Sequence, residues 1–157
     1  MGEPLAEQRP FIVNQNLVIN YRYFAGKVGS RFFAQLRDKK KILGIRCQKC
    51  NRVYFPPRST CGRCFSQLRK WVPLSGQGAL ETYTVIYHPQ PTYPVEVPFA
   101  YGVIRLDGAD TGIGHLLGEV DFSRLHVGMR VQAVFKEQRQ GNMLDIKYFK
   151  PLYSASP

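Results

Sequence analysis

The stretch that decides the fold is CQKCNRVYFPPRSTCGRC, residues 47–64. It holds all four cysteines of the chain, in two C-x-x-C pairs that ten residues separate. Two C-x-x-C turns on facing hairpin ends place four thiolates at the corners of a tetrahedron, an arrangement that suits zinc. Asn51, directly after the first pair, is one of the few residues besides glycine that accept the left-handed backbone such turns often need. We therefore predict a closed metal site with four ligands, Cys47, Cys50, Cys61 and Cys64.

Other chemistries compete for the same cysteines. A redox-active iron site of the rubredoxin kind uses the same ligands, so the residues alone leave zinc and iron open. Disulfides need an oxidising compartment, and neighbouring C-x-x-C cysteines staple a small domain poorly. A closed four-sulfur zinc site has no open position for water or substrate, and its binding energy goes into folding. We therefore expect zinc in a structural role.

Hydrophobic periodicity predicts a helix before this stretch. Apolar residues recur every four positions from Phe24 through Val28 and Phe32 to Leu36, while basic residues cover the other face. After the cysteines the period changes to two. Alternating residues predict five strands, over 78–87, 99–106, 112–120, 129–135 and 143–149, with a helical turn at 122–126. Three glycines fit a strand that bends sharply to close a barrel, Gly112, Gly114 and Gly118.

Five strands with a short helix between the third and the fourth are typical of an OB-fold barrel. The predicted fold class is mainly β with an N-terminal α-helix: a rubredoxin-like zinc ribbon followed by a five-stranded OB-fold. We expect an extended arm at 1–20, a helical segment at 21–42, the zinc ribbon at 43–72 and the barrel at 73–157.

The positive charge is confined to the first half of the chain. The formal net charge is +11, yet residues 1–75 hold fifteen Lys and Arg against three Asp and Glu, a net of +12, and residues 76–157 carry a net of −1. An acidic ligand or partner should therefore bind mainly to the helix and the ribbon.

These motifs carry a resemblance to a known family. The chain resembles, over about residues 24–152, the zinc-ribbon plus OB-fold proteins formerly called domain of unknown function 35. Asn51 departs from the glycine that relatives usually carry, which casts little doubt on the metal site. The matching segments are GIRCQKC at 44–50, FPPR at 55–58, CGRC at 61–64, LDGAD at 106–110, GMRV at 128–131 and YFKP at 148–151.

The resemblance implies a non-catalytic subunit of thiolase-superfamily enzymes that act on coenzyme A esters. Its settings include archaeal thiolase and synthase assemblies, steroid side-chain retro-aldolases and benzoylsuccinyl-CoA thiolase, and a thiolase or thiolase-like partner is the reading that we favour. Coenzyme A carries a pyrophosphate and a 3′-phosphate, which Arg and Lys bind, and a pantetheine arm, which needs an apolar slot. Candidate contacts to the acyl-CoA are Lys40, Lys41, Arg46, Tyr54, Phe55, Arg58 and Arg63, although core packing is an equal role for the two aromatic residues.

A nucleic-acid-binding zinc-ribbon and OB-fold protein is the alternative. The charge of the barrel half argues against strand binding by the barrel, because such a groove needs positive charge along its length. No nucleotide-binding loop, serine-hydrolase elbow or zinc-protease motif occurs, and every cysteine is assigned to metal. We expect no catalytic residues in this chain, no membrane span and a cytoplasmic location.

Overall fold

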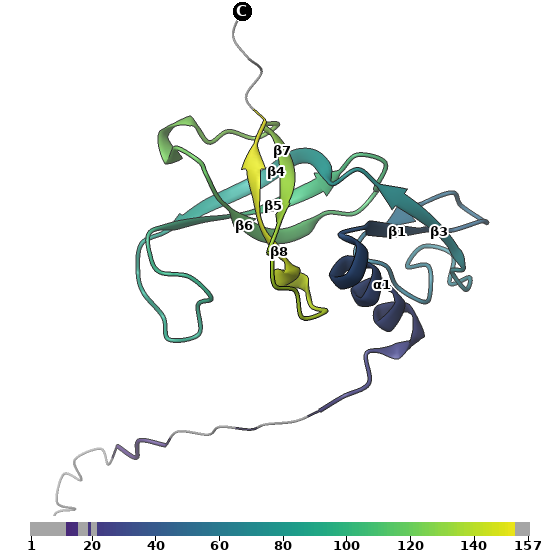
Figure 1. Cartoon of the computed structure of the whole chain (residues 1–157), viewed down its shortest axis with the longest axis horizontal. Helices are drawn as coiled ribbons and strands as arrows, with labels where there is room; N and C mark the ends of the chain where they lie inside the picture. The colour runs from purple at the N-terminus through teal and green to yellow at the C-terminus, as the bar shows by residue number, and fades with distance from the viewer. Residues whose placement is uncertain (1–11, 16–18, 20–21, 153–157) are drawn as a thin grey trace, which may run out of the picture.

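The computed structural model describes residues 12–15, 19 and 22–152, and the predicted arm at 1–20 lies mostly outside them. The helix and the ribbon sheet lie on one side of the barrel, and the long loop between strands β4 and β5 extends from its other side (Figure 1). No helix in the described part of the chain has the length and apolar character that crossing a bilayer requires. The elements are α1 (Gly26–Lys39), β1 (Ile42–Arg46), β2 (Val53–Tyr54), β3 (Lys70–Leu74), β4 (Gln77–Ile86), β5 (Phe99–Leu106), β6 (Ile113–Leu117), η1 (Phe122–Arg124), β7 (Arg130–Phe135), η2 (Met143–Asp145) and β8 (Ile146–Pro151).

Helix α1 buries the apolar stripe that the sequence predicts, with one correction at its start. Phe32 and Leu36 are buried in the core, as expected. Phe24 does not belong to the stripe: it precedes the helix and its side chain is 80% exposed. The reason is Gly26, the first residue of α1, whose positive φ of 75° changes the direction of the chain where the helix begins and leaves Phe24 off the packed face.

The ribbon is a three-stranded antiparallel sheet in the order β2-β1-β3. Ile45 of β1 pairs with Tyr54 on one side and with Trp71 on the other. Ile45 and Tyr54 are buried with Leu68 and two of the cysteines in a small cluster of their own. The sheet therefore has the metal ligands packed against its centre.

The barrel closes in the order β4-β5-β6-β8-β7, which confirms the predicted OB-fold class. Strand β6 is shorter than predicted and meets β8 in a single parallel pair, Leu117 with Phe149. The glycines near β6 make room for rings: a Cβ on Gly118 would come within 2.4 Å of Tyr148, and one on Gly114 within 2.8 Å of Tyr101. Tyr101 lies on β5 and Tyr148 on β8, the two strands beside β6. These glycines therefore allow close packing of the rings more than a sharp bend of the strand.

Helix, ribbon and barrel share one hydrophobic core. Phe32 of α1 and Phe55, directly after β2, meet edge to face with ring centroids 6.1 Å apart. Both belong to the same buried cluster as Leu80, Ile104 and Phe149 of the barrel. The ribbon is thus packed against the barrel through buried side chains, so the metal ligands are held in a defined place relative to it.

Candidate metal centre and the adjoining basic surface

The four predicted cysteines converge on one point. Their sulfur atoms all lie within 4.8 Å of one another. The Sγ atoms of Cys47 and Cys64 are 3.5 Å apart, and those of Cys50 and Cys61 are 3.6 Å apart. Four sulfurs on a tetrahedron around zinc, each about 2.3 Å from the ion, are roughly 3.8 Å from one another. The four thiols therefore fit a tetrahedral zinc ion, and they would saturate its coordination.

The two C-x-x-C turns have the same backbone geometry. The Cys47 N–H donates to the Arg52 carbonyl at 2.8 Å, and the Cys61 N–H donates to the Ser66 carbonyl at 2.9 Å. In each turn the residue after the second cysteine is left-handed: φ is 58° at Asn51 and 55° at Phe65. Asn51 thus adopts the conformation that the sequence indicated. The left-handed backbone at Phe65 was not predicted. The available signal was its position, because Phe65 follows the second C-x-x-C pair as Asn51 follows the first.

Neutral hydroxyl groups contact the sulfur atoms. The Tyr54 hydroxyl lies 3.2 Å from Cys61 Sγ and accepts a hydrogen bond from the Gly62 N–H at 3.1 Å. The Ser66 hydroxyl lies 3.2 Å from the Sγ atoms of both Cys47 and Cys64. Donation from Tyr54 lowers the pKa of the Cys61 thiol to about 5, and donation from Ser66 lowers the pKa of the Cys47 thiol to about 7. The thiolate, which is the metal-binding form, is thus favoured at these two cysteines. At Cys50, the hydrogen bond from the Arg52 backbone is outweighed by burial and by hydrogen bonds with the neighbouring thiols, which raise the pKa of the thiol to about 11.

Two of the predicted coenzyme A contacts are buried in the structure. Tyr54 and Phe55 are only 3% and 0% exposed, because Tyr54 packs against the metal ligands and Phe55 fills the core between helix and barrel. Neither ring offers a surface to a pantetheine arm here. Their burial favours core packing, which the sequence left as the equal alternative.

The predicted basic contacts lie in different settings. Arg58 stacks over the Tyr54 ring, with its guanidinium carbon 4.8 Å from the ring centroid. Arg46 donates to the Asn51 carbonyl at 3.5 Å, and the Lys40 ammonium lies 3.9 Å from the Glu137 carboxylate. The other two predicted contacts, Lys41 and Arg63, are exposed.

A polar hollow of about 250 Å³ adjoins the metal ligands. It brings the predicted Arg63 together with Arg52, which the sequence analysis did not single out. The Arg52 guanidinium also donates to the Asp110 carbonyl at 3.4 Å through one of its terminal nitrogens, so that nitrogen faces the barrel. Arg52 and Arg63 come from different turns, which is why their proximity was not evident from spacing. The lining residues are Cys50, Asn51, Arg52, Arg63 and Asp110.

The chain matches two families that describe its two halves. Residues 35–69 match the family described as ChsH2, rubredoxin-like zinc ribbon domain, and residues 71–136 match the family described as ChsH2, C-terminal OB-fold domain. The metal-binding interpretation of the four cysteines agrees with the first of these matches.

Curated relatives match between about two fifths and four fifths of the chain. A DUF35 domain-containing scaffold protein of Methanocaldococcus jannaschii is 28% identical over 131 residues, which cover 80% of this chain and 92% of the relative. A scaffold protein of the same description from Pyrococcus furiosus is 24% identical, over 71% of this chain and 80% of the relative. The benzoylsuccinyl-CoA thiolase subunit BbsA of Thauera aromatica is 33% identical over 65 residues, which cover 41% of this chain and 44% of that protein.

Solved structures show the same fold. One chain of a structure described as Ltp2-ChsH2(DUF35) aldolase covers 83% of this chain and 98% of its own length, with a TM-score of 0.61 and 21% identity. A DUF35 protein from Sulfolobus solfataricus covers 69% of this chain and 78% of its own, with a TM-score of 0.57 and 26% identity. With the ribbon and most of the barrel each matched by a family and the four cysteines gathered as the ribbon requires, this protein belongs to the DUF35 family of zinc-ribbon plus OB-fold proteins.

Proposed function

We propose that this protein is a non-catalytic zinc-containing subunit that docks on a thiolase-type enzyme and helps to hold the coenzyme A ester. In this proposal the partner carries out the thiolytic, Claisen or retro-aldol chemistry. The present chain contributes by positioning the ester. Holding a bound ester in a reactive orientation can lower the barrier of the reaction by roughly several kcal/mol.

The observation that carries the proposal is that all four cysteines of the sequence meet in one closed sulfur cluster. A zinc ion bound there would be coordinated by four sulfurs, with no position left for a substrate or a water molecule. Attack on a thioester needs a free nucleophile, and cysteines that coordinate zinc cannot supply one. The cluster therefore supports a structural metal and a partner that provides the chemistry.

The names of relatives support the same assignment. The archaeal relatives are called scaffold proteins, and BbsA is called a subunit of a thiolase. A scaffold or subunit acts on a substrate together with another chain. By this similarity we expect the partner to belong to the thiolase superfamily.

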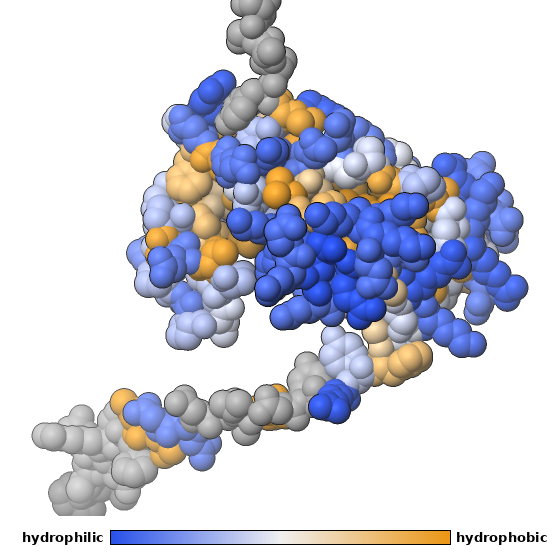
Figure 2. All heavy atoms as spheres, viewed as in Figure 1, coloured by the Kyte–Doolittle hydropathy of each residue, from blue (hydrophilic) through white to orange (hydrophobic). Residues whose placement is uncertain are grey.

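Charge supports a role in binding an anionic ligand. On the face shown in Figure 2, the most hydrophilic side chains gather over α1 and the ribbon. Guanidinium groups form charge-assisted hydrogen bonds with phosphate oxygens. Arg52 and Arg63 line one polar hollow, so we place the phosphates of coenzyme A at this hollow. The exposed Lys40, Lys41 and Arg58 and the half-buried Arg46 are kept as further proposed contacts.

The barrel supports the nucleic-acid alternative only weakly. Two exposed tyrosines lie on β4 and β5, where an OB-fold stacks bases. Both already have structural roles, however: the Tyr83 hydroxyl donates to the Leu125 carbonyl at 2.8 Å, and Tyr101 fills the space above Gly114. The barrel half also carries a net charge of −1, which opposes binding to a polyanion.

Affinity purification of the full chain from its native cells tests the proposal. A thiolase-superfamily enzyme should co-purify, and the complex should bind coenzyme A more weakly when Arg52 and Arg63 are both changed to Ser. Arg22→Ser with Arg69→Ser is the matched control, because both arginines are exposed and neither lines the hollow. Turnover of an acyl-CoA by the chain alone would refute the proposal, and salt-sensitive binding of a random oligonucleotide would favour the alternative.

A further inference from the structure

A second hollow lies on the barrel, at the seam between β6 and β8. These strands pair only at Leu117 and Phe149, so the rest of the seam is not closed by backbone hydrogen bonds. The turn η2 and the loop between β4 and β5 border the opening. A hollow of about 340 Å³ remains, which is within the range that small-molecule sites occupy.

The floor of this hollow is apolar. Six of its nine lining residues have aliphatic, proline or phenyl side chains, and a seventh is a tyrosine. Leu144 and Val95 are each 40% exposed, so apolar surface is accessible at the rim. The full lining is Pro94, Val95, Phe99, Leu116, Leu117, Lys136, Leu144, Lys147 and Tyr148.

Two cations edge the hollow and no carboxylate lines it. Lys147 lies over the Tyr148 ring, with its Nζ 5.3 Å from the ring centroid. Among the described residues, neither Lys136 nor Lys147 forms an ion pair. Glu119, which accepts a hydrogen bond from the Tyr148 hydroxyl at 2.5 Å, is paired with Lys150 at 3.5 Å. The edge of the hollow is therefore electropositive.

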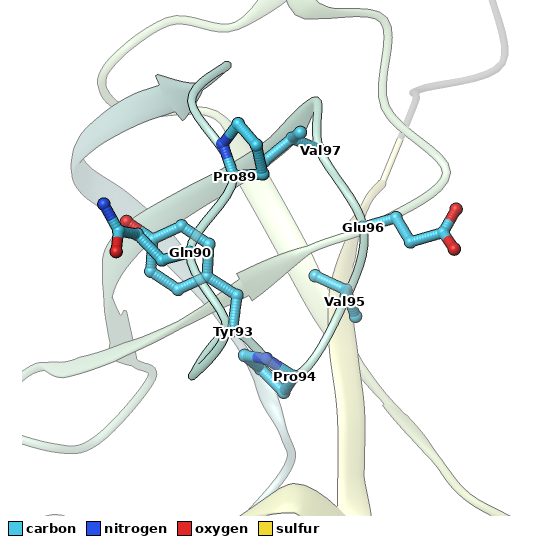
Figure 3. A pocket seen from close by; sticks show the side chains of 7 residues that line it. All are labelled: Pro89, Gln90, Tyr93, Pro94, Val95, Glu96 and Val97. Atoms are coloured by element: carbon cyan, nitrogen blue, oxygen red, sulfur yellow. The ribbon is translucent and has the colours of Figure 1, made fainter. Parts of the chain in front are cut away.

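The loop between β4 and β5 extends the apolar surface. A further hollow of about 520 Å³ lies within this loop and shares Pro94 and Val95 with the one at the seam. Figure 3 shows the side chains of Tyr93, Pro94 and Val95 along this hollow; Glu96 also lines it, with its carboxylate directed outward from the loop. Glu96 does not line the hollow at the seam, whose lining includes the two lysines.

We infer that the β6–β8 seam is a binding site for a small hydrophobic anion, an aryl or alkyl group that carries a carboxylate or sulfonate. The apolar body would lie against Phe99, Leu116 and Leu144, where it is removed from water. The acid would meet Lys136 and Lys147, whose long side chains reach the rim without being buried. This site lies on the barrel and its lining shares no residue with the hollow beside the cysteines.

A pair of fluorescent probes tests the site on the full, zinc-loaded chain. The probe 1-anilinonaphthalene-8-sulfonate has the two ring systems and an anion, whereas N-phenyl-1-naphthylamine has the same rings without charge. We expect saturable binding of both probes. Changing Lys136 and Lys147 together to Gln should weaken binding of the sulfonate about fivefold and leave the neutral probe unchanged, since the ammonium groups are solvent-exposed. The matched control is Lys27→Gln with Lys70→Gln, two exposed lysines away from the seam.

Leu144→Glu should abolish binding of both probes, because it places a carboxylate at the apolar rim. Val95→Asp is a second variant at an exposed position, in case the first perturbs η2. Absence of saturable binding to the wild-type chain would overturn the inference. So would a folded Leu144→Glu or Val95→Asp variant that binds the sulfonate as tightly as wild type, or a lysine pair whose removal leaves the sulfonate affinity unchanged.

Discussion

Val53 and Asp110 exchange two hydrogen bonds across the joint between ribbon and barrel. The Val53 N–H donates to the Asp110 carboxylate at 2.7 Å, and the Asp110 N–H donates to the Val53 carbonyl at 2.8 Å. Next to them, Thr111 Oγ accepts from the Phe55 N–H at 2.9 Å and donates to the Phe55 carbonyl at 2.8 Å. Strand β2 is the edge of the ribbon sheet, and these groups satisfy its outer side.

Removing the Asp110 carboxylate should therefore loosen the joint. We expect Asp110→Ala to reduce the free energy of unfolding by about 1–2 kcal/mol, because the N–H of the buried Val53 loses a charged acceptor. Urea denaturation of the zinc-loaded protein measures this. Glu137→Ala is the control: its carboxylate is 92% exposed and 3.9 Å from Lys40, so the change should be near zero. Equal stability of the two variants would show that the joint depends on apolar packing alone.

The Tyr54 hydroxyl should help to retain the metal. Tyr54→Phe removes the donor to Cys61 Sγ and the acceptor of the Gly62 N–H, while the ring and its packing stay in place. Loss of such an outer contact typically weakens metal binding about 10–100-fold. Competition with a chromogenic chelator gives the zinc affinity directly.

Tyr148→Phe is the matched control for this change, since its hydroxyl bonds to Glu119 on the barrel. We expect the control to hold zinc as wild type does. A Tyr54→Phe variant with unchanged zinc affinity would mean that the four cysteines alone set the strength of the site.

Local pattern was enough to predict the metal ligands and the barrel. The C-x-x-C pairs lie close together in sequence, so their spacing carries their geometry, and strand alternation reproduced β5 as Phe99–Leu106. The contacts across the joint were missed because Val53 and Asp110 are 57 residues apart, and no local pattern indicates such a pairing. Strand β2 has only two residues, which is too short to show an alternation of apolar and polar side chains. The burial of both Val53 and Tyr54 was therefore not evident from the sequence.

The left-handed backbone at Phe65 should reduce the stability of the fold. Its φ of 55° is disfavoured for a side chain with a bulky Cβ substituent, and its ring is 79% exposed, so little packing offsets the strain. We expect Phe65→Asn to stabilise the protein by about 0.5–1 kcal/mol, since Asn tolerates this conformation as it does at Asn51. Thermal and urea unfolding measure the gain.

Phe24→Asn is the control for that substitution. Phe24 is as exposed as Phe65 but is not among the residues with positive φ, so replacing it should leave stability unchanged. A destabilised Phe65→Asn variant would indicate that the ring makes a packing contribution larger than the backbone strain.

Burial of His115 should make stability depend on pH. The Leu116 N–H donates to His115 Nδ1 at 2.9 Å, so the neutral ring carries its proton on Nε2, which lies 3.3 Å from the Met143 carbonyl. Burial lowers the pKa of His115 below its ordinary value of 6.5. The unfolded chain therefore takes up a proton first as the pH falls, so stability is complete above about pH 6.5 and declines below it, towards the lower pKa of the folded state. One proton limits the slope to about 1.4 kcal/mol per pH unit.

We expect the His115→Gln variant to be less stable than wild type at pH 8 yet to lose less stability between pH 7 and 6. Urea denaturation with the zinc content monitored measures both quantities. His126→Gln, at an exposed position, should keep the wild-type slope, and an unchanged slope in His115→Gln would assign the pH dependence to another group.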